Sequence, residues 1–311
     1  MSGITQRWMG QGNEVKPTYT TGDRLAGVLD ITRPILSTMG ALGVAAAAAL
    51  ANGGFPAWNK CLIGFIAALL ALAGIHAFND YADKRRDVVC WPGRPLPSRR
   101  LNSWQGLTIA MGSYAIALVI VWFGFNPTCF AVSAVAIASG CLYSGYLRDR
   151  IGYLVLPPIE GMLWLCGWAA FSPETLFTSW APWVLWAFSA TWQAGHIMVY
   201  SPLHPISHIN DKKLTQVPAF IKRTSPQTAT IIGFLFLWLT AAFGIYLGFY
   251  FDLGLLYVLP TAIMAAVALV ICFHYVRDPE NFAKGIKTFS FATYFMLVAR
   301  VFILISVLLF Y

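Results

Sequence analysis

Long runs of apolar residues, separated by shorter polar segments, dominate the hydrophobic pattern of this chain. Nine runs are near the length of about 20 residues that a helix needs to cross a bilayer. They lie near residues 26–51, 58–78, 104–124, 127–145, 152–171, 180–200, 227–250, 254–275 and 288–310. Because an open strand cannot satisfy its backbone hydrogen bonds in lipid, all nine runs are predicted to be helices.

Positively charged residues give these runs an orientation. Of the 21 Lys and Arg residues, 18 lie in the N-terminal tail and in every second connection, whereas Lys60 lies on the other side. Cytoplasmic loops carry an excess of Lys and Arg. We therefore expect a cytoplasmic tail over residues 1–25, one membrane domain over residues 26–311, a cytoplasmic N-terminus and a C-terminus on the opposite side.

The composition supports a membrane protein. Hydrophobic residues make up 58% of the chain and charged residues 11%, against about 25% charged residues in soluble domains. The net charge of +8 is spread over membrane-proximal segments, which favours anionic headgroups or an anionic substrate as partners and argues against nucleic acid. Six cysteines without a CxxC pair predict neither a disulfide framework nor a zinc site. Residues 1–22 lack the apolar core of a cleavable signal peptide.

Four oxygen-bearing side chains gather at the end of the second run. Asn79, Asp83 and Asp87 follow one another at intervals of four, and Asp80 lies three residues before Asp83. All four therefore share one broad face of a helix. Carboxylates are costly in apolar surroundings unless they are paired or hold a metal. Ligands that are all oxygen favour Mg²⁺, which usually shares its shell with substrate phosphates.

Basic residues follow these acids closely, at Lys84, Arg85, Arg86 and Arg94. They suit a diphosphate better than a stored metal ion. The alternative is a solvated helix end whose acids pair with the same bases. The spacing of the acids favours a site for Mg²⁺ and a diphosphate.

A second polar segment follows the sixth run, and it contains Asp211 seven residues before Pro218. Asp87 precedes Pro95 by eight residues, which indicates a diverged internal repeat. Four helices separate the two segments, so the two halves could face each other across a central cavity capped by cytoplasmic loops. Transporters built from repeats share this arrangement and stay open as an alternative.

The first motif resembles a known family. "NDYADKRRD" at residues 79–87, followed by "RPLPS", resembles the NDxxDxxxD motif of the UbiA superfamily of intramembrane prenyltransferases. Arg33-Pro34 and "YSGYLR" at 143–148, which is similar to YSxxLK, support the resemblance. It covers residues 30 to 220 and implies a UbiA-like all-α domain of nine transmembrane helices. The second motif departs from the usual DxxxD or DxxGD, because only Asp211 is present.

The resemblance implies roles for individual residues. Asn79 and Asp83 would hold a first Mg²⁺ with support from Asp80 and Asp87, and Asp211 would serve a second metal site. The basic residues expected to bind phosphate oxygens are Arg33, Lys84, Arg94 and Arg148. Their plain alternatives are snorkelling at the membrane boundary and topology signalling.

Aromatic residues provide candidates for the rest of the site. Trp192, His196 and Tyr200 share one helix face at intervals of four. Aromatic rings can stabilise a carbocation, and His196 could remove a proton from an acceptor, although ordinary packing gives the same spacing. Tyr143 and Tyr146 are candidates of the same kind.

Two charged residues, Glu160 and Arg300, lie deep inside predicted helices. Charges within a membrane are candidates for a functional role. The plain interpretation is structural, and we expect the two residues to pair with each other.

The predicted activity is Mg²⁺-dependent transfer of a prenyl group from an isoprenyl diphosphate, geranylgeranyl or similar, to a hydrophobic acceptor. An aromatic quinone precursor is the acceptor we expect. Haem, prenylated glycerol phosphates, chlorophyllides and carotenoids are alternatives, as is a terpene cyclase of the same superfamily. A cation-coupled transporter is the alternative from another class, but it would place acids along a pore and not at one membrane face.

Overall fold

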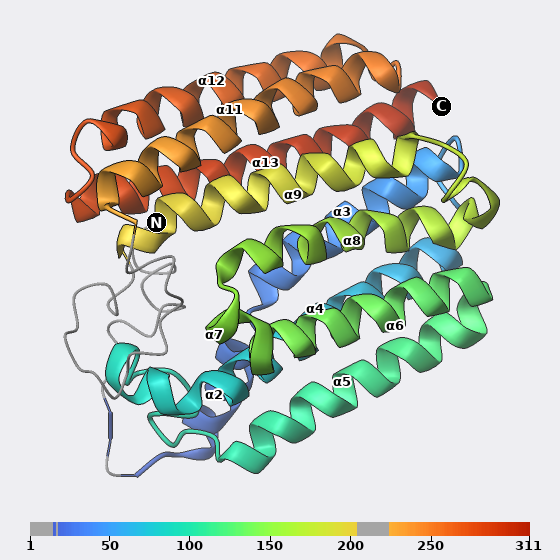
Figure 1. Ribbon diagram of the computed structural model, residues 1–311. Helices are drawn as coiled ribbons and strands as arrows, with labels where there is room; N and C mark the ends of the chain where they lie inside the picture. Colours follow the sequence, from blue (N-terminus) through green and yellow to red (C-terminus); the bar gives the residue numbers. More distant parts are fainter. Residues whose placement is uncertain (1–14, 17, 204–223) are drawn as a thin grey trace.

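The computed structural model describes residues 15–16, 18–203 and 224–311, and every element in these ranges is helical. Long helices run side by side through the molecule (Figure 1). They are α3 (Pro34–Ala51), α4 (Trp58–Cys90), α5 (Ser103–Gly124), α6 (Pro127–Leu142), α8 (Leu156–Phe171), α9 (Ala181–Tyr200), α11 (Pro226–Tyr250), α12 (Gly254–Val276) and α13 (Phe282–Phe310). Seven of the described spans are long and apolar enough to cross a membrane by themselves, and α8 and α9 complete the predicted nine. The all-α, multi-pass fold is confirmed.

Short elements lie between the long helices. At the end of the molecule where the acids of α4 lie, they are α2 (Thr21–Thr32), the π-helix η1 (Tyr143–Leu147), α7 (Arg148–Arg150), and the 3₁₀ turns η2 (Tyr153–Val155) and η4 (Ser201–Leu203). At the opposite end, η3 (Pro173–Thr175) connects α8 to α9. The candidate site is therefore surrounded by short, irregular pieces of chain, and the far end is made mostly of tight connections.

Polar side chains begin many of the helices. Each accepts a hydrogen bond from a backbone N–H of the first turn, which would otherwise lack a partner. They are Thr20, Asn102, Asn126, Ser225 and Asn281. The sequence thus marks the helix starts with residues that favour the cap over the helix interior.

The first predicted helix is broken where a single helix over residues 26–51 was expected. Arg33 has a left-handed backbone (φ 45°, ψ 62°), so that it ends α2 and precedes α3. Pro34 follows as the first residue of α3. A residue before proline is disfavoured in the right-handed helical region, and this explains why the helix stops here.

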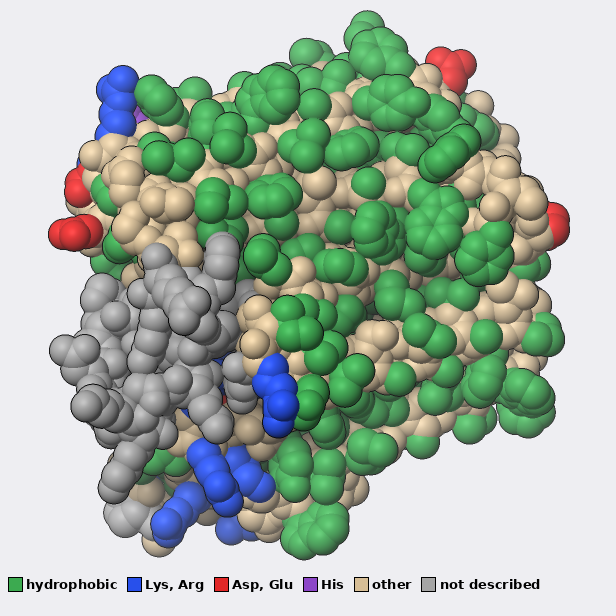
Figure 2. Space-filling model, viewed as in Figure 1, with side chains coloured by type: hydrophobic (Ala, Val, Ile, Leu, Met, Phe, Trp, Pro, Cys, Tyr) green, Lys and Arg blue, Asp and Glu red, His purple; other side chains and the backbone are tan. Residues whose placement is uncertain are grey.

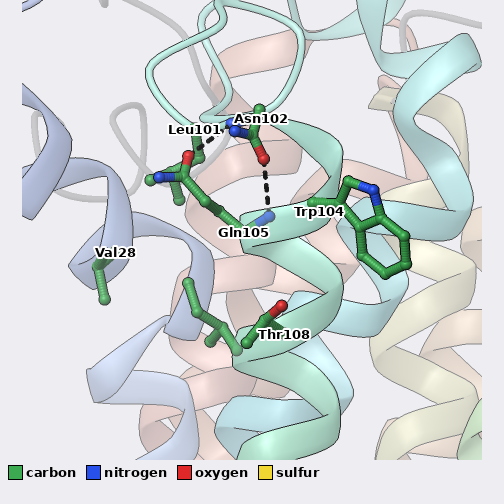
Figure 3. A pocket seen from close by; sticks show the side chains of 7 residues that line it. Val28, Leu101, Asn102, Trp104, Gln105 and Thr108 are labelled. Atoms are coloured by element: carbon green, nitrogen blue, oxygen red, sulfur yellow. Dashed lines mark hydrogen bonds between the residues drawn. The ribbon is translucent and has the colours of Figure 1, made fainter.

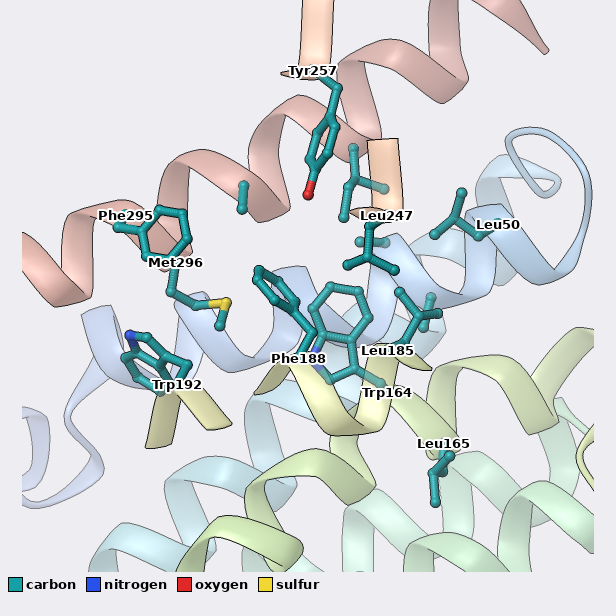
Figure 4. Packing of buried hydrophobic residues seen from close by; sticks show 14 of the residues in the cluster. Leu50, Trp164, Leu165, Leu185, Phe188, Trp192, Leu247, Tyr257, Phe295 and Met296 are labelled. Atoms are coloured by element: carbon teal, nitrogen blue, oxygen red, sulfur yellow. The ribbon is translucent and has the colours of Figure 1, made fainter. Parts of the chain in front are cut away.

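The largest apolar cluster lies where α3, α8, α9 and α13 meet (Figure 4). Trp164 of α8 contacts Phe188 of α9 edge to face, with ring centroids 6.1 Å apart, and Phe188 contacts Phe295 of α13 in the same way at 6.4 Å. All three rings are almost fully buried. This packing holds together helices that are far apart in sequence.

The outer surface between the two ends is apolar. Ile116, Trp238 and Ile263, in the middle of α5, α11 and α12, are among the large hydrophobic side chains exposed there, and hydrophobic side chains cover most of the face seen in Figure 2. Most of the Lys and Arg side chains visible in that view lie at the end of the molecule near α2. An apolar surface of this kind suits contact with lipid chains.

Candidate active site

The acidic residues occupy the last turns of α4. This helix has 33 residues and is therefore about 50 Å long, more than the roughly 30 Å of a bilayer's apolar core. Its last turns can thus reach the membrane surface. The side chains are nevertheless buried, with exposed fractions of 2% for Asp80, 6% for Asp83 and 2% for Asp87. Three buried carboxylates require partners of opposite charge.

Arginines from two other segments bind the first and last of these acids. Arg33 Nη2 lies 2.5 Å from Asp80 Oδ1. Arg94 Nη1 lies 2.7 Å from Asp87 Oδ2 and 3.6 Å from Asp80 Oδ1. The left-handed backbone at Arg33 occurs at the residue whose side chain enters the site. Backbone strain of this kind is often found at functional positions.

Asp83 is bound by two further arginines. Arg148 Nη1 donates to Asp83 Oδ2 at 2.7 Å, while its Nη2 donates to Oδ1. This is the two-pronged arrangement that favours Arg over Lys. Arg86, one turn further along α4, also donates to Oδ1. Arg86 was noted as a basic neighbour of the motif but was not among the predicted site residues.

The π-helix η1 brings a second segment of chain against α4. The backbone N–H of Arg148 donates to Tyr143 O, five residues earlier, which is the bond pattern of a π-helix. Asn79 Nδ2 donates to Ser144 Oγ at 3.3 Å. Ser144 was missed by the sequence interpretation, and its place in "YSGYLR" was the only available signal. Short π-helical turns frequently occur at functional sites.

Arg94 has the properties of an anion-binding side chain. Burial opposes its charged form, but Asp87 and Asp80 more than offset this effect and raise the pKa of its guanidinium above the ordinary value. It therefore stays charged at any physiological pH. Its Nε is buried and has no hydrogen-bond partner among the described residues. A phosphate oxygen would satisfy this donor.

The donor set of α4 fits Mg²⁺. The candidate ligands are carboxylate and amide oxygens, which Mg²⁺ prefers. Within the described ranges, no group of three or more His, Cys, Asp or Glu side chains is arranged to bind a metal alone. Mg²⁺ commonly uses one or two carboxylates together with water and substrate phosphates. Asp83 would supply one carboxylate, and Asn79, one turn earlier on α4, would add an amide oxygen.

The face of α9 that carries Trp192, His196 and Tyr200 packs mainly against α13. Trp192 Nε1 donates to the backbone oxygen of Ala292 at 2.8 Å. The His196 ring is stacked between Trp192 and Phe289, with centroids 4.7 and 4.0 Å away. Tyr200, at the end of the helix, lies close enough to Arg94 to influence the pKa of its guanidinium. This face therefore extends from the apolar core towards the arginines.

His196 also has a polar contact. Its Nε2 lies 3.0 Å from the hydroxyl oxygen of Thr293 on α13. The ring is half-buried. Its position is therefore fixed by stacking on both sides and by one hydrogen bond.

The remaining predicted residues differ in their contacts. Tyr143 is buried beneath the Arg148 guanidinium, which lies 5.8 Å from the ring centroid. Tyr146 is 48% exposed and carries Arg150 over its ring, and Lys84 lies over the ring of Tyr81 at 4.1 Å. The structure thus brings Tyr143 into the cluster and places Tyr146 at its outer side. Asp211 lies outside the described residues.

Glu160 and Arg300 pair as expected. Arg300 Nη2 lies 3.2 Å from Glu160 Oε1 and 3.3 Å from Ser189 Oγ, and its Nη1 donates to Met39 O at 2.7 Å. Arg300 is 1% exposed. One side chain of α13 thus connects α3, α8 and α9.

A hollow of about 360 Å³ lies between α2 and the start of α5 (Figure 3). Val28, Leu101 and Ile109 supply apolar lining, and Asn102 and Gln105 form the reciprocal cap of α5 at its upper edge. None of the acids of α4 lines it. It is a surface feature beside the candidate site.

Comparison with known proteins gives this geometry a context. The model of the UbiA prenyltransferase family matches residues 41–305. A digeranylgeranylglyceryl phosphate synthase from Thermococcus kodakarensis is 30% identical over 45% of this chain and 50% of its own length, so the match spans half of that relative. A protoheme IX farnesyltransferase from Desulforudis audaxviator is 24% identical over 91% of this chain and 88% of its own length.

Solved structures share the fold. The apo structure of a UbiA homologue from Aeropyrum pernix K1 has a TM-score of 0.71 at 17% identity, covering 87% of this chain and 98% of that one. A UbiA homologue from Archaeoglobus fulgidus, bound to GPP and Mg²⁺, has a TM-score of 0.58 at 11% identity, covering 89% and 99%. Since the family model matches most of the sequence, the chain belongs to the UbiA prenyltransferase family.

Proposed function

We propose that the protein transfers a prenyl group from an isoprenyl diphosphate to a hydrophobic acceptor inside the membrane, with Mg²⁺ as cofactor. The cluster of buried charges at the end of α4 carries the proposal. Its four arginines outnumber its three carboxylates, so the cluster has a net positive charge before a ligand binds. An anionic headgroup would be attracted to it, while the apolar helices beside it would accept an isoprenoid chain.

The arginines would bind the diphosphate and stabilise it as it leaves. Arg33, Arg94 and Arg148 are fixed in place by the carboxylates that they contact, so little reorganisation is needed when negative charge develops. The bond between the allylic carbon and the diphosphate oxygen breaks, and its electron pair leaves with the diphosphate. When bound by Asn79 and Asp83, Mg²⁺ would supply Lewis-acid neutralisation of this charge. Asp80 and Asp87 would support that site, and Asp211 stays a proposed ligand of a second ion.

The allylic cation must meet the acceptor before water does. With an aromatic acceptor, a ring carbon forms the new C–C bond and the ring then loses a proton. His196, fixed by Thr293 and two aromatic rings, is our proposed acceptor of that proton. Trp192 and Tyr200 would line the pocket, with Tyr143 close to the leaving group, and Lys84 and Tyr146 at its outer side.

The acceptor that we propose first is an aromatic quinone precursor. A tetrapyrrole such as haem is the second candidate, because similarity to a protoheme IX farnesyltransferase runs through 91% of this chain, α9 included. The match to digeranylgeranylglyceryl phosphate synthases covers 45%, and gives the prenylated glycerol phosphates less support. Both leading acceptor candidates are planar, conjugated molecules.

The test is to incubate the purified protein with Mg²⁺, geranyl, farnesyl or geranylgeranyl diphosphate, and either a 4-hydroxybenzoate-type aromatic acid, haem or a lipid extract. Mass spectrometry then identifies the product. A conjugate supports transfer, a cyclised hydrocarbon supports a terpene cyclase, and no consumption of any diphosphate contradicts the proposal.

Asp83→Asn should reduce consumption of the diphosphate at least 100-fold, as should chelation of Mg²⁺. The matched control is Asp278→Asn, which changes a half-exposed acid in the connection before α13. It should act like the parent protein. Equal rates in the Asp83 variant and the parent would contradict the proposal that Asp83 is a metal ligand.

A further inference from the structure

Asp30 and Arg100 form a further, largely buried ion pair beside the charge cluster. Asp30 Oδ2 lies 2.6 Å from Arg100 Nη1, and the two side chains are only 12% and 8% exposed. Asp30 belongs to α2, and Arg100 lies near the end of the loop of residues 91–102, which we call the arginine loop because it carries Arg94. The pair therefore connects α2 to the arginine loop.

The guanidinium of Arg100 also holds the arginine loop from within. Its Nη2 donates to Gly93 O at 3.0 Å, and its Nε donates to Ser98 Oγ at 3.4 Å. Gly93 is directly followed by Arg94. One buried side chain thus fixes the backbone from which Arg94 reaches Asp87.

Asp30 places the ion pair next to Arg33, as Arg100 places it next to Arg94. It lies one turn before Arg33 on the same helix. Arg33 and Arg94 both approach the same oxygen, Asp80 Oδ1, at 2.5 and 3.6 Å. The ion pair therefore joins the two pieces of backbone that bring these arginines together.

Close packing at Gly27 brings α2 into direct contact with the arginine loop. At Gly27, an added Cβ would lie only 3.3 Å from Leu101 Cγ and 3.4 Å from Arg100 Cβ. A larger residue there would press α2 away from the arginine loop. The direct contact between α2 and the loop thus keeps Asp30 within reach of Arg100.

We propose that Arg100, held by Asp30, is a positioning residue that sets the separation of Arg33 and Arg94 and thereby determines the affinity for the diphosphate headgroup. This inference rests on the proposed function. Arg100 acts through the other two arginines and takes no part in bond breaking. Its loss should weaken binding of the diphosphate and leave the chemical step almost unchanged.

The experiment uses the full-length protein in nanodiscs, with inorganic pyrophosphate and Mg²⁺ as the probe. Isothermal titration gives Kd, and transfer assays give KM for the isoprenyl diphosphate separately from kcat. Arg100→Gln and Asp30→Asn should raise Kd and KM about tenfold while kcat changes less than twofold. Amide hydrogen exchange should become faster in the arginine loop.

Conservative variants separate positioning from folding. Asp30→Glu keeps the carboxylate and should recover most of the affinity. Arg100→Lys can reach Asp30 or Gly93 O but cannot bind both in the planar geometry of Arg, so its Kd should lie between those of the parent and Arg100→Gln. If Arg100→Gln does not fold, the Asp30→Asn and Asp30→Glu pair still decides the question.

Lys284→Gln is the matched control, because it breaks an ion pair of 2.8 Å with Asp278 on the same end of the molecule. Its Kd should not change. Parent-like Kd and KM in folded Arg100→Gln or Asp30→Asn would overturn the positioning role alone. A parent protein that neither binds pyrophosphate nor consumes any isoprenyl diphosphate would instead overturn the proposed function.

Discussion

At the scale of single residues, the candidate site is a set of ions that hold one another in place. Asp83 receives both prongs of Arg148 and a further bond from Arg86, and neither side chain type would be stable there alone. The sequence predicted the acids because their spacing is local. Pairing with the nearby bases was the alternative interpretation, and the structure shows it for Arg86 and Arg94. The sequence did not predict Arg33 and Arg148 as partners of the acids, because they reach α4 from segments 47 and 65 residues away.

The two-pronged contact of Arg148 leads to a first prediction. Arg148→Lys should lower kcat/KM about 10- to 100-fold, because a single ammonium cannot replace the paired charge-assisted bonds, each of which contributes about 1.5–3 kcal/mol. Steady-state assays over a range of isoprenyl diphosphate concentrations measure this. Arg150→Lys is the control, since Arg150 is exposed and lies over Tyr146. Equal losses in both variants would contradict a specific role for Arg148.

The buried pair of Glu160 and Arg300 leads to a second prediction. Glu160→Arg should destabilise the protein by about 3–5 kcal/mol, because two positive charges would then face each other in a largely buried site. Adding Arg300→Glu should recover part of this loss, but not all, since Arg300 also binds Met39 O. Thermal unfolding in detergent measures both effects. A double variant no more stable than Glu160→Arg would show that the two charges do not stabilise each other.

At the scale of elements, the lengths of the apolar runs in the sequence predicted where the helices lie. They did not predict the irregularities within the helices. Runs of about 20 apolar residues located the long helices because lipid permits little else. The break at Arg33 interrupts a run that the hydrophobic pattern treats as continuous, and the π-helix η1 lies across the end of the run over residues 127–145. Pro34 was a visible signal for the break. The π-helix contacts α4 through Ser144 and Asn79, a contact between distant segments that no local pattern reports.

The arginine loop offers a third prediction, at Arg99. This exposed residue has a left-handed backbone (φ 64°), a conformation that costs a β-branched residue most and glycine nothing. Arg99→Val should therefore lower stability by about 1–2 kcal/mol, whereas Arg99→Gly should be at least as stable as the parent. Thermal unfolding compares them. At Arg24, in the regular helix α2, valine should be tolerated better than glycine; the same order at both positions would refute the backbone argument.

At the scale of the whole molecule, long helices surround a core that is shared by sequence-distant segments. The sequence could place each helix in the membrane, but it could not show that α9 uses its aromatic face to pack against α13. That outcome depends on which side chains fit together, as with His196 between Trp192 and Phe289. The residues that were predicted from shared spacing to line a pocket therefore also pack against α13, and their pocket-lining role stays a prediction.

The distribution of Lys and Arg leads to a fourth prediction, that the N-terminus is cytoplasmic and the C-terminus is on the opposite side. An alkaline phosphatase fusion after Tyr311 should be active in a bacterial host, because this reporter folds only outside the cytoplasm. A fusion in the connection between α12 and α13 should be inactive. The reverse pattern would mean that the candidate site opens to the other side of the membrane.

The contact of Arg300 with Met39 joins the last long helix to the first. During translation α13 leaves the ribosome after α3, α8 and α9, so these helices are made before their contacts on α13 exist. Until then, Glu160 has no countercharge from Arg300, and the indole N–H of Trp192 has no Ala292 carbonyl to bind. A premature stop codon before α13 would thus yield a nascent chain with unmatched polar groups in the bilayer, a recognisable substrate for membrane quality-control proteases.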